Sequence, residues 1–143
     1  MYLEFKYLHS IIAFFLLAGL ITSIVFTAAT WLRKKPFSKA NKIIVQAGMG
    51  FAHLQFLMGM ILYFQSPLGM SNFSGTAMKI AITRLYIVEH PIMMILGIVL
   101  ITIGYMKGIR LADDTKKFKT IVIFYSLGLL FFLSRIPWAT WTL

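Results

Sequence analysis

The amino-acid sequence predicts an all-α integral membrane protein, a four-helix bundle with both termini on the outer, periplasmic side. Of its 143 residues, 59% are hydrophobic and only 13% are charged, and the mean hydropathy is +0.84. This composition excludes an ordinary soluble domain. Four apolar runs each match the roughly 20 helical residues that cross a bilayer core. The loops are too short for a second domain, so we expect one transmembrane domain over residues 1–143.

The first predicted span covers residues 11–32, in a helix that begins near Leu3. A secretory signal peptide is also N-terminal and apolar. However, this run is longer than a typical signal core, and Glu4 accompanies Lys6 in front of it. It ends in a basic stretch that starts at Arg33 and offers no small-residue cleavage site. We therefore expect the first span to remain in the mature protein.

Three further spans are predicted at residues 43–64, 86–106 and 120–136. Between the second and third, Pro67, Gly69 and Gly75 interrupt the helix, and the polar residues around them favour turns. The stretch after Gly75 alternates apolar and basic residues, which is typical of a short amphipathic turn at the membrane surface. This turn is expected to lead into the third span and to cap a pocket from the outer side.

Basic residues are distributed unequally between the two sides of the predicted bundle. Ten belong to the first and third loops: Arg33, Lys34, Lys35, Lys39, Lys42, Lys107, Arg110, Lys116, Lys117 and Lys119. Only Lys6, Lys79, Arg84 and Arg135 belong to the opposite side. By the positive-inside rule, the first and third loops face the cytoplasm. The charges form juxtamembrane clusters beside apolar spans, so we expect contact with anionic lipid and no binding of nucleic acid.

Three histidines, His9, His53 and His90, are the only imidazoles in the chain, and each belongs to a different apolar segment. An ionisable or metal-binding side chain inside a membrane indicates a functional site. Three such side chains on three helices predict a haem held inside the bundle. The chain contains no cysteine, which excludes iron–sulfur clusters and covalent haem attachment. The expected cofactor is therefore one non-covalent haem b per chain.

Glycines share helix faces with two of these histidines. Gly97 and Gly104 follow His90 at intervals of seven residues, and Gly50 precedes His53 by three. Small residues beside an imidazole would leave room for a flat macrocycle, so Gly97 and Gly50 are candidate cofactor contacts. The alternative is that the glycines serve close packing between membrane helices, without any cofactor.

The two axial ligands of one haem iron must lie at nearly the same depth. Counting about 1.5 Å of rise per residue from the basic helix ends, we place His53 at about 16 Å, His90 at about 25 Å and His9 at about 36 Å. By this estimate, no two of the three histidines lie at the same depth. His90 is the expected ligand in either case. The second position stays open between His9, on the diagonal helix, and His53, and the remaining histidine would bind a propionate or line a quinone or proton path.

Arg135 is predicted at the level of His90, with Arg84 and Lys79 above it. Guanidinium groups bind carboxylates through two parallel hydrogen bonds, so this cluster is the expected site of the haem propionates. Alternatively, Arg135 extends towards the interface beside the C-terminal tryptophans. Glu89 is expected to pair with Arg135 or Lys6 on another helix, because the five-residue spacing from Arg84 is poor for a bridge along one helix.

Four segments carry a resemblance to known proteins: KYLHS at 6–10, FAHLQ at 51–55, RLYIVEHP at 84–91 and SRIPW at 134–138. Together they resemble a family of small bacterial membrane proteins named cytochrome b, which is common in Bacteroidetes. The resemblance covers nearly the whole chain and implies a four-helix inner-membrane protein with b-type haem. The opening Lys-x-x-His is also similar to the start of the membrane haem-dependent protoporphyrinogen oxidases.

The function expected from these observations is electron transfer by a b-type cytochrome in the bacterial cytoplasmic membrane. The expected partners are the lipid bilayer and either quinone, other subunits of a respiratory complex or a second copy of the chain. Two alternatives stay open. One is a haem-dependent oxidase of a porphyrinogen or quinol, and the other is a haem-free structural or assembly subunit of a membrane complex.

Overall fold

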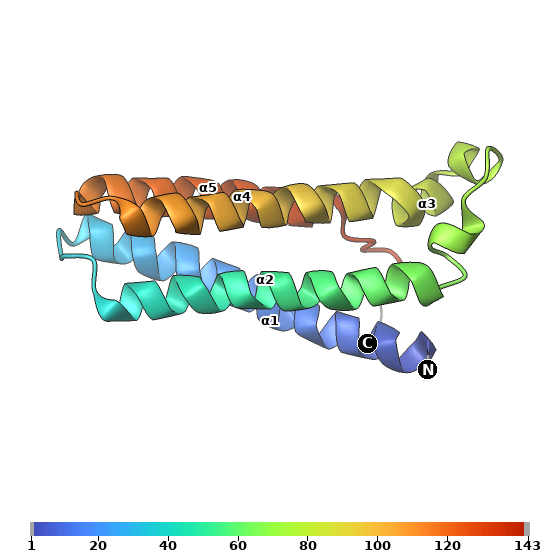
Figure 1. Cartoon of the computed structure of the whole chain (residues 1–143), viewed down its shortest axis with the longest axis horizontal. Coiled ribbons are helices and arrows are strands. Elements are labelled where there is room, and N and C mark those ends of the chain that lie inside the picture. Colours follow the sequence, from blue (N-terminus) through green and yellow to red (C-terminus); the bar gives the residue numbers. More distant parts are fainter. Residues whose placement is uncertain (1, 142–143) are drawn as a thin grey trace.

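A computed structural model describes residues 2–141 and is entirely helical over its regular elements. Four long helices cross the molecule: α1 (Tyr2–Leu32), α2 (Lys39–Gln65), α4 (His90–Arg110) and α5 (Asp114–Arg135). Short elements connect α2 to α4: the 3₁₀ turns η1 (Met70–Asn72) and η2 (Ala77–Lys79), one turn α3 (Ala81–Arg84) and the π-helical turn η3 (Leu85–Glu89). Both ends of the described chain lie at the same end of the bundle (Figure 1).

The helix boundaries follow from local chemistry at each N-terminus. Ser38 caps α2, since its side chain accepts a hydrogen bond from the backbone N–H of Asn41 and the Asn41 side chain accepts from the backbone N–H of Ser38. Asp113 caps α5 by accepting from Lys116 N–H at 2.7 Å. Both caps lie next to the basic loops. At this end α2, α4 and α5 continue four to six residues beyond their predicted apolar runs, whereas α1 ends at Leu32 as predicted.

The four helices form two close pairs, α1 with α2 and α4 with α5, which lie over one another as two layers (Figure 1). Glycines allow the close approach within each pair. A Cβ on Gly48 would come within 2.6 Å of Ser23 Oγ of α1, and a Cβ on Gly128 would come within 2.9 Å of the Gly97 carbonyl oxygen of α4. The Ser23 hydroxyl also lies within hydrogen-bond distance of the Gly19 and Ile44 carbonyls. Small residues at helix interfaces are typical of membrane bundles.

Most of the tightly packed core lies towards the basic loops, whereas its members Leu16, Ala52 and Phe132 also line a cavity towards the termini. The core consists of Leu16, Leu20, Val45, Ala52, Ile101, Tyr105, Ile121, Tyr125 and Phe132. The Tyr125 hydroxyl donates to the Val45 carbonyl at 2.7 Å, which satisfies the polar group of a fully buried ring. The opposite half, towards the termini, is less completely filled and contains a cavity.

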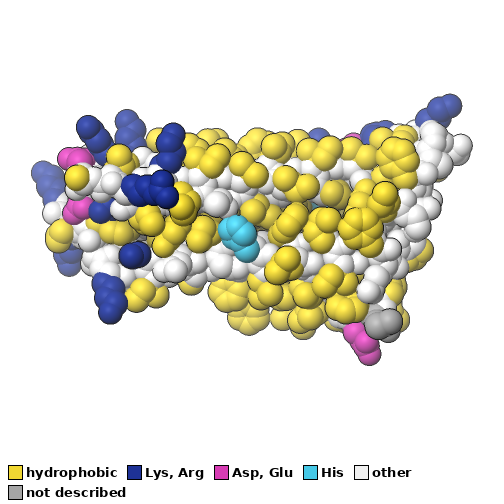
Figure 2. Space-filling model, viewed as in Figure 1, with side chains coloured by type: hydrophobic (Ala, Val, Ile, Leu, Met, Phe, Trp, Pro, Cys, Tyr) yellow, Lys and Arg dark blue, Asp and Glu magenta, His cyan; other side chains and the backbone are white. Residues whose placement is uncertain are grey.

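The outer surface is apolar along most of the length of the bundle. Four helices are long and apolar enough to cross a membrane. Large hydrophobic side chains such as Phe15, Val25, Leu57 and Leu130 are exposed on the outside. Figure 2 shows this apolar belt with Lys and Arg gathered at one end, where the first and third loops meet. The predicted four-helix, membrane-type architecture is confirmed to this extent.

Candidate functional site

His9 of α1 and His90 of α4 face each other across the bundle. Their ring centroids are 6.4 Å apart, and the ring planes make an angle of 75°. The two helices belong to different pairs and have little direct contact, which leaves room for the side chains between them. The depths estimated from the rise per residue, which put no two histidines at the same level in the bundle, are therefore wrong for His9 and His90. The estimate took Lys107 as the basic end of the third span, but α4 extends to Arg110, and α1 runs obliquely to its neighbours (Figure 1).

His90 has a well-defined ring orientation. Its Nδ1–H donates to the carbonyl oxygen of Arg135 at 2.8 Å. This carbonyl belongs to the last residue of α5, where helix carbonyls lack a partner within the helix, and Pro137 just beyond it has no N–H to offer. A carbonyl can only accept, so the proton is on Nδ1 and Nε2 is left with its lone pair. This is the usual arrangement of a metal-binding histidine.

The imidazole of His9 packs against α2. Its Nε2 lies 3.2 Å from the amide nitrogen of Gln55, and a Cβ on Gly59 would come within 3.2 Å of its Cε1. Two buried polar atoms, Nδ1 of the His9 ring and Oε1 of Gln55, have no hydrogen-bond partner. Such orphaned atoms are uncommon and costly in folded proteins. A metal on one ring nitrogen would leave the other as an N–H donor, which the Gln55 oxygen could accept after a turn of the amide.

A cavity of about 650 Å³ opens between the two helix pairs, and both His9 and His90 line it. Its wall is mostly apolar and comes from all four long helices, with Leu17, Phe56, Ile95 and Phe132 among its members. Polar groups of Lys6, Tyr2 and Tyr86 line it towards the terminal end. The volume falls within the range of about 300 to 1,000 Å³ that is typical of pockets for cofactors and small ligands.

The C-terminal segment after α5 covers one side of this cavity. Pro137, Thr140 and Trp141 all line it, and the Trp141 ring stacks on Phe14 of α1 with centroids 4.7 Å apart. The hydroxyls of Tyr86 and Thr140 are also hydrogen-bonded to each other. The segment thereby links α5, the turn η3 and α1 at the terminal end of the bundle. The sequence suggested only an interfacial aromatic belt here, and the fold makes it part of the cavity wall.

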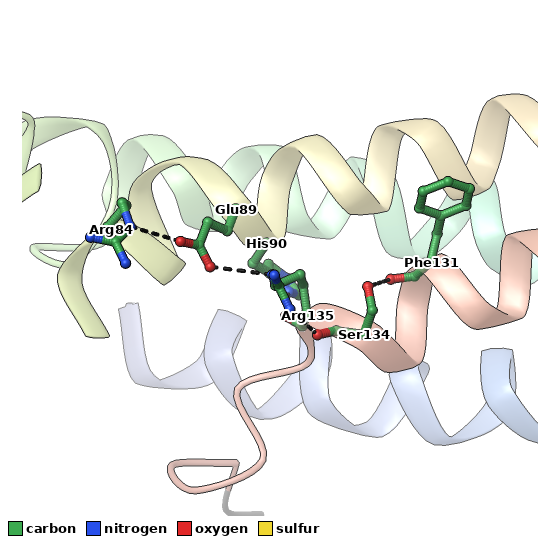
Figure 3. Close-up of polar contacts among 6 residues, drawn as sticks. All are labelled: Arg84, Glu89, His90, Phe131, Ser134 and Arg135. Carbon is green, nitrogen blue, oxygen red and sulfur yellow. Dashed lines mark hydrogen bonds and ion pairs between the residues drawn. The ribbon is translucent and has the colours of Figure 1, made fainter. Parts of the chain in front are cut away.

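Behind His90, Glu89 joins two arginines (Figure 3). Its carboxylate oxygens lie 2.7 Å from Arg84 Nε and 3.2 Å from Arg135 Nε. The predicted partnership with Arg135 is confirmed, but the argument against an Arg84–Glu89 bridge is wrong. The two residues flank the π-helical turn η3, in which residues five apart lie over each other. Arg84 and Arg135 thus neutralise Glu89, and neither lines the cavity.

His53 does not join the other two histidines. It is exposed on the outer surface, where its Nδ1 lies 2.9 Å from the Met49 carbonyl and its Nε2 lies 3.3 Å from the Thr102 hydroxyl. It does not line the cavity, whereas Gln55, two residues further along α2, does. Neighbouring positions two residues apart on a helix point about 200° apart, so Gln55 and His53 face opposite sides. His53 is deep in its span but directed outwards.

The glycine candidates also differ from expectation. A Cβ on Gly97 would come within 2.5 Å of Phe132, and one on Gly104 within 2.3 Å of Phe124, both on α5. These glycines serve helix packing, and neither lines the cavity. Gly50 has nothing within 4 Å of its Cβ position and faces outwards. Gly59, which sequence reasoning missed, does adjoin a histidine and lies between two methionines in the last third of the second span.

Among residues 2–141, no three side chains of His, Cys, Asp or Glu gather as at a typical all-protein metal site. Of these residue types, His9 and His90 are the ones that line the cavity within the described part of the chain. No protein-family model, curated protein or solved structure matches this chain.

Proposed function

We propose that this chain is a b-type haem protein that transfers electrons within the bacterial cytoplasmic membrane. One non-covalent haem b would lie between His9 and His90. The observation that carries this proposal is the 6.4 Å separation of the two ring centroids. Two metal–imidazole bonds of about 2 Å, plus roughly 1 Å from each nitrogen to its ring centre, place the centroids of two axial imidazoles about 6 Å apart.

The surroundings of the two rings support the same cofactor. The cavity is large enough for a cofactor-sized ligand and mostly apolar, as a porphyrin requires. Nε2 of His90 has a free lone pair, and Nδ1 of His9 has no hydrogen-bond partner in the protein. Both atoms would therefore be available to a cofactor.

Bound haem would supply a one-electron iron couple, and the residues of this chain would position and tune it. The Arg135 carbonyl holds the His90 ring and increases its basicity by accepting from Nδ1. Gln55 and Gly59 define the position of the His9 ring from α2. In this proposal the two ligands come from helices of separate close pairs, and packing within each pair would hold them in position.

Two histidine ligands favour electron transfer over the oxidase alternative. A bis-histidine site has no open coordination position for a substrate, which an oxidase reacting at the iron would need. The partners we propose are the bilayer itself and an electron carrier, either quinone or another subunit of a respiratory complex. His53, exposed on the lipid-facing surface, does not take part in haem ligation in this proposal.

The test is the reduced-minus-oxidised absorption spectrum of the full chain, purified in detergent after expression with sufficient haem. We expect a sharp low-spin band, loss of that band in His9→Ala and in His90→Ala, and its retention in the matched variant His53→Ala. A high-spin spectrum of the wild type would favour the oxidase. The absence of a Soret band would overturn both haem functions, and full low-spin haem in either His9→Ala or His90→Ala would overturn the ligand pair.

A further inference from the structure

The cavity has a charged side at the terminal end of the bundle. Of the described residues that line it, Lys6 alone carries a fixed charge. Lys6 precedes His9 by three residues, so the two side chains share a face of α1, with Lys6 about 4.5 Å nearer the N-terminal end. The Lys6 side chain is only partly exposed. An ammonium group that enters an apolar cavity requires an anionic or polar partner there.

The basic residues that first suggested an anion site are already paired. Glu89 holds both Arg84 and Arg135, and the Arg84 Nη1 group also donates to the Met78 carbonyl at 3.1 Å. A carboxylate of the ligand would have to displace Glu89 to bind either arginine, and both side chains lie outside the cavity wall. Lys79 is exposed and also lies outside it. Lys6 forms no ion pair with any residue between 2 and 141.

We infer that Lys6 binds a carboxylate of the cavity's ligand, so that a haem would lie with its propionate edge towards the start of α1. This inference rests on the proposed haem function and deepens it. It sets the orientation of the macrocycle, with the apolar edge towards the packed core and the acidic edge towards the membrane surface. Tyr2 lines the same cavity and provides a hydroxyl donor for the second propionate, whereas the Tyr86 hydroxyl is already hydrogen-bonded to Thr140.

The experiment compares two probes that differ only in their carboxylates, haemin and haemin dimethyl ester. Each is titrated into the haem-depleted full chain in neutral detergent, and binding is followed by the Soret band. The proteins are the wild type, Lys6→Met, Lys6→Arg and Lys79→Met. A partly buried charge-assisted hydrogen bond corresponds to about a tenfold change in affinity. We expect Lys6→Met to weaken haemin binding by about tenfold and to leave binding of the ester unchanged.

Comparing the two probes across these variants distinguishes loss of the propionate contact from loss of haem binding itself. Lys6→Arg and Lys79→Met should bind haemin like the wild type, and added salt should weaken haemin binding to the wild type more than to Lys6→Met. If Lys6→Met bound haemin as tightly as the wild type, or lost haemin and the ester equally, the propionate contact would be wrong while the haem function stood. If the wild type bound haemin and its dimethyl ester with equal affinity, that result alone would overturn the propionate contact. If the wild type bound neither probe, both proposals would fall.

Discussion

Glu89 illustrates how one irregular turn changes which residues meet. In a regular α-helix, residues five apart point about 140° from each other, so Arg84 and Glu89 would not pair. The π-helical turn between them brings the two side chains together at 2.7 Å. Tyr63 of α2 donates to the Ile87 carbonyl within this turn at 3.0 Å, which helps to hold its shape. Turns of this kind are frequent at functional sites, and here the turn immediately precedes His90.

Gly59 is the residue whose size matters most at the proposed site. Its hydrogen atom faces the His9 ring, and even a Cβ would approach the Cε1 atom to 3.2 Å. Gly50 on the same helix has open space instead. Gly50 is therefore a matched control position for Gly59, because it is on the same helix but faces outwards.

We predict that Gly59→Leu displaces the His9 ring and lowers haem affinity by about tenfold or more, because overpacking of this kind costs about 1 to 3 kcal/mol. Gly50→Leu should leave haem affinity unchanged, since its side chain enters open space. Haem titration followed by the Soret band measures both. Equal loss in the two variants would indicate a general folding defect, and unchanged affinity in Gly59→Leu would contradict the position assigned to His9.

The contact between α4 and α5 depends on a stripe of small residues. Gly97, Gly104 and Gly108 of α4 face side chains of α5 that a Cβ would approach to between 2.3 and 2.5 Å. Sequence periodicity correctly placed Gly97 and Gly104 on one face, but it could not say whether that face meets a cofactor or a helix. The structure places Phe132 and Phe124 there, so packing is the physical reason for these glycines.

We predict that Gly97→Ala destabilises the bundle by about 1 to 3 kcal/mol, since the added methyl group meets the buried Phe132 ring and the Gly128 carbonyl. Gly50→Ala is the matched control. It should be neutral or up to about 1 kcal/mol more stable, because alanine favours helix and the site is open. Unfolding of the purified chain in mixed micelles, followed by circular dichroism, measures the difference. Equal stability of the two variants would contradict the packing role of Gly97.

The molecule as a whole divides along its length into a packed half and a hollow half. Most core residues lie towards the basic loops, while the cavity lies towards the termini. The basic loops and the termini are at opposite ends of the bundle (Figure 1). The strong asymmetry of basic charge between the two ends is the feature that sets orientation in a membrane. We therefore propose that the packed half faces the cytoplasm and that the cavity lies in the outer half of the bilayer.

The orientation is testable because the chain has no cysteine of its own. Lys35→Cys places a thiol in the first loop, and Thr76→Cys places one at the opposite end, both at exposed positions. In intact bacterial cells, a membrane-impermeant maleimide should label Thr76→Cys, and it should label Lys35→Cys only after the cells are permeabilised. The reverse pattern would contradict the proposed orientation, and labelling of both in intact cells would contradict insertion in the cytoplasmic membrane.

The four helices follow from the sequence alone, because apolar runs of the right length and capping residues such as Ser38 and Asp113 act locally. The charge asymmetry between the ends is likewise a property of the sequence. The pairing of His9 with His90 and the outward direction of His53 depend on helix tilt and rotation, and these are set by contacts between helices. The Arg84–Glu89 pair depends on a π turn that a regular 3.6-residue period does not contain. Local patterns thus define the elements, whereas the site arises from how four nearly independent helices pack against one another.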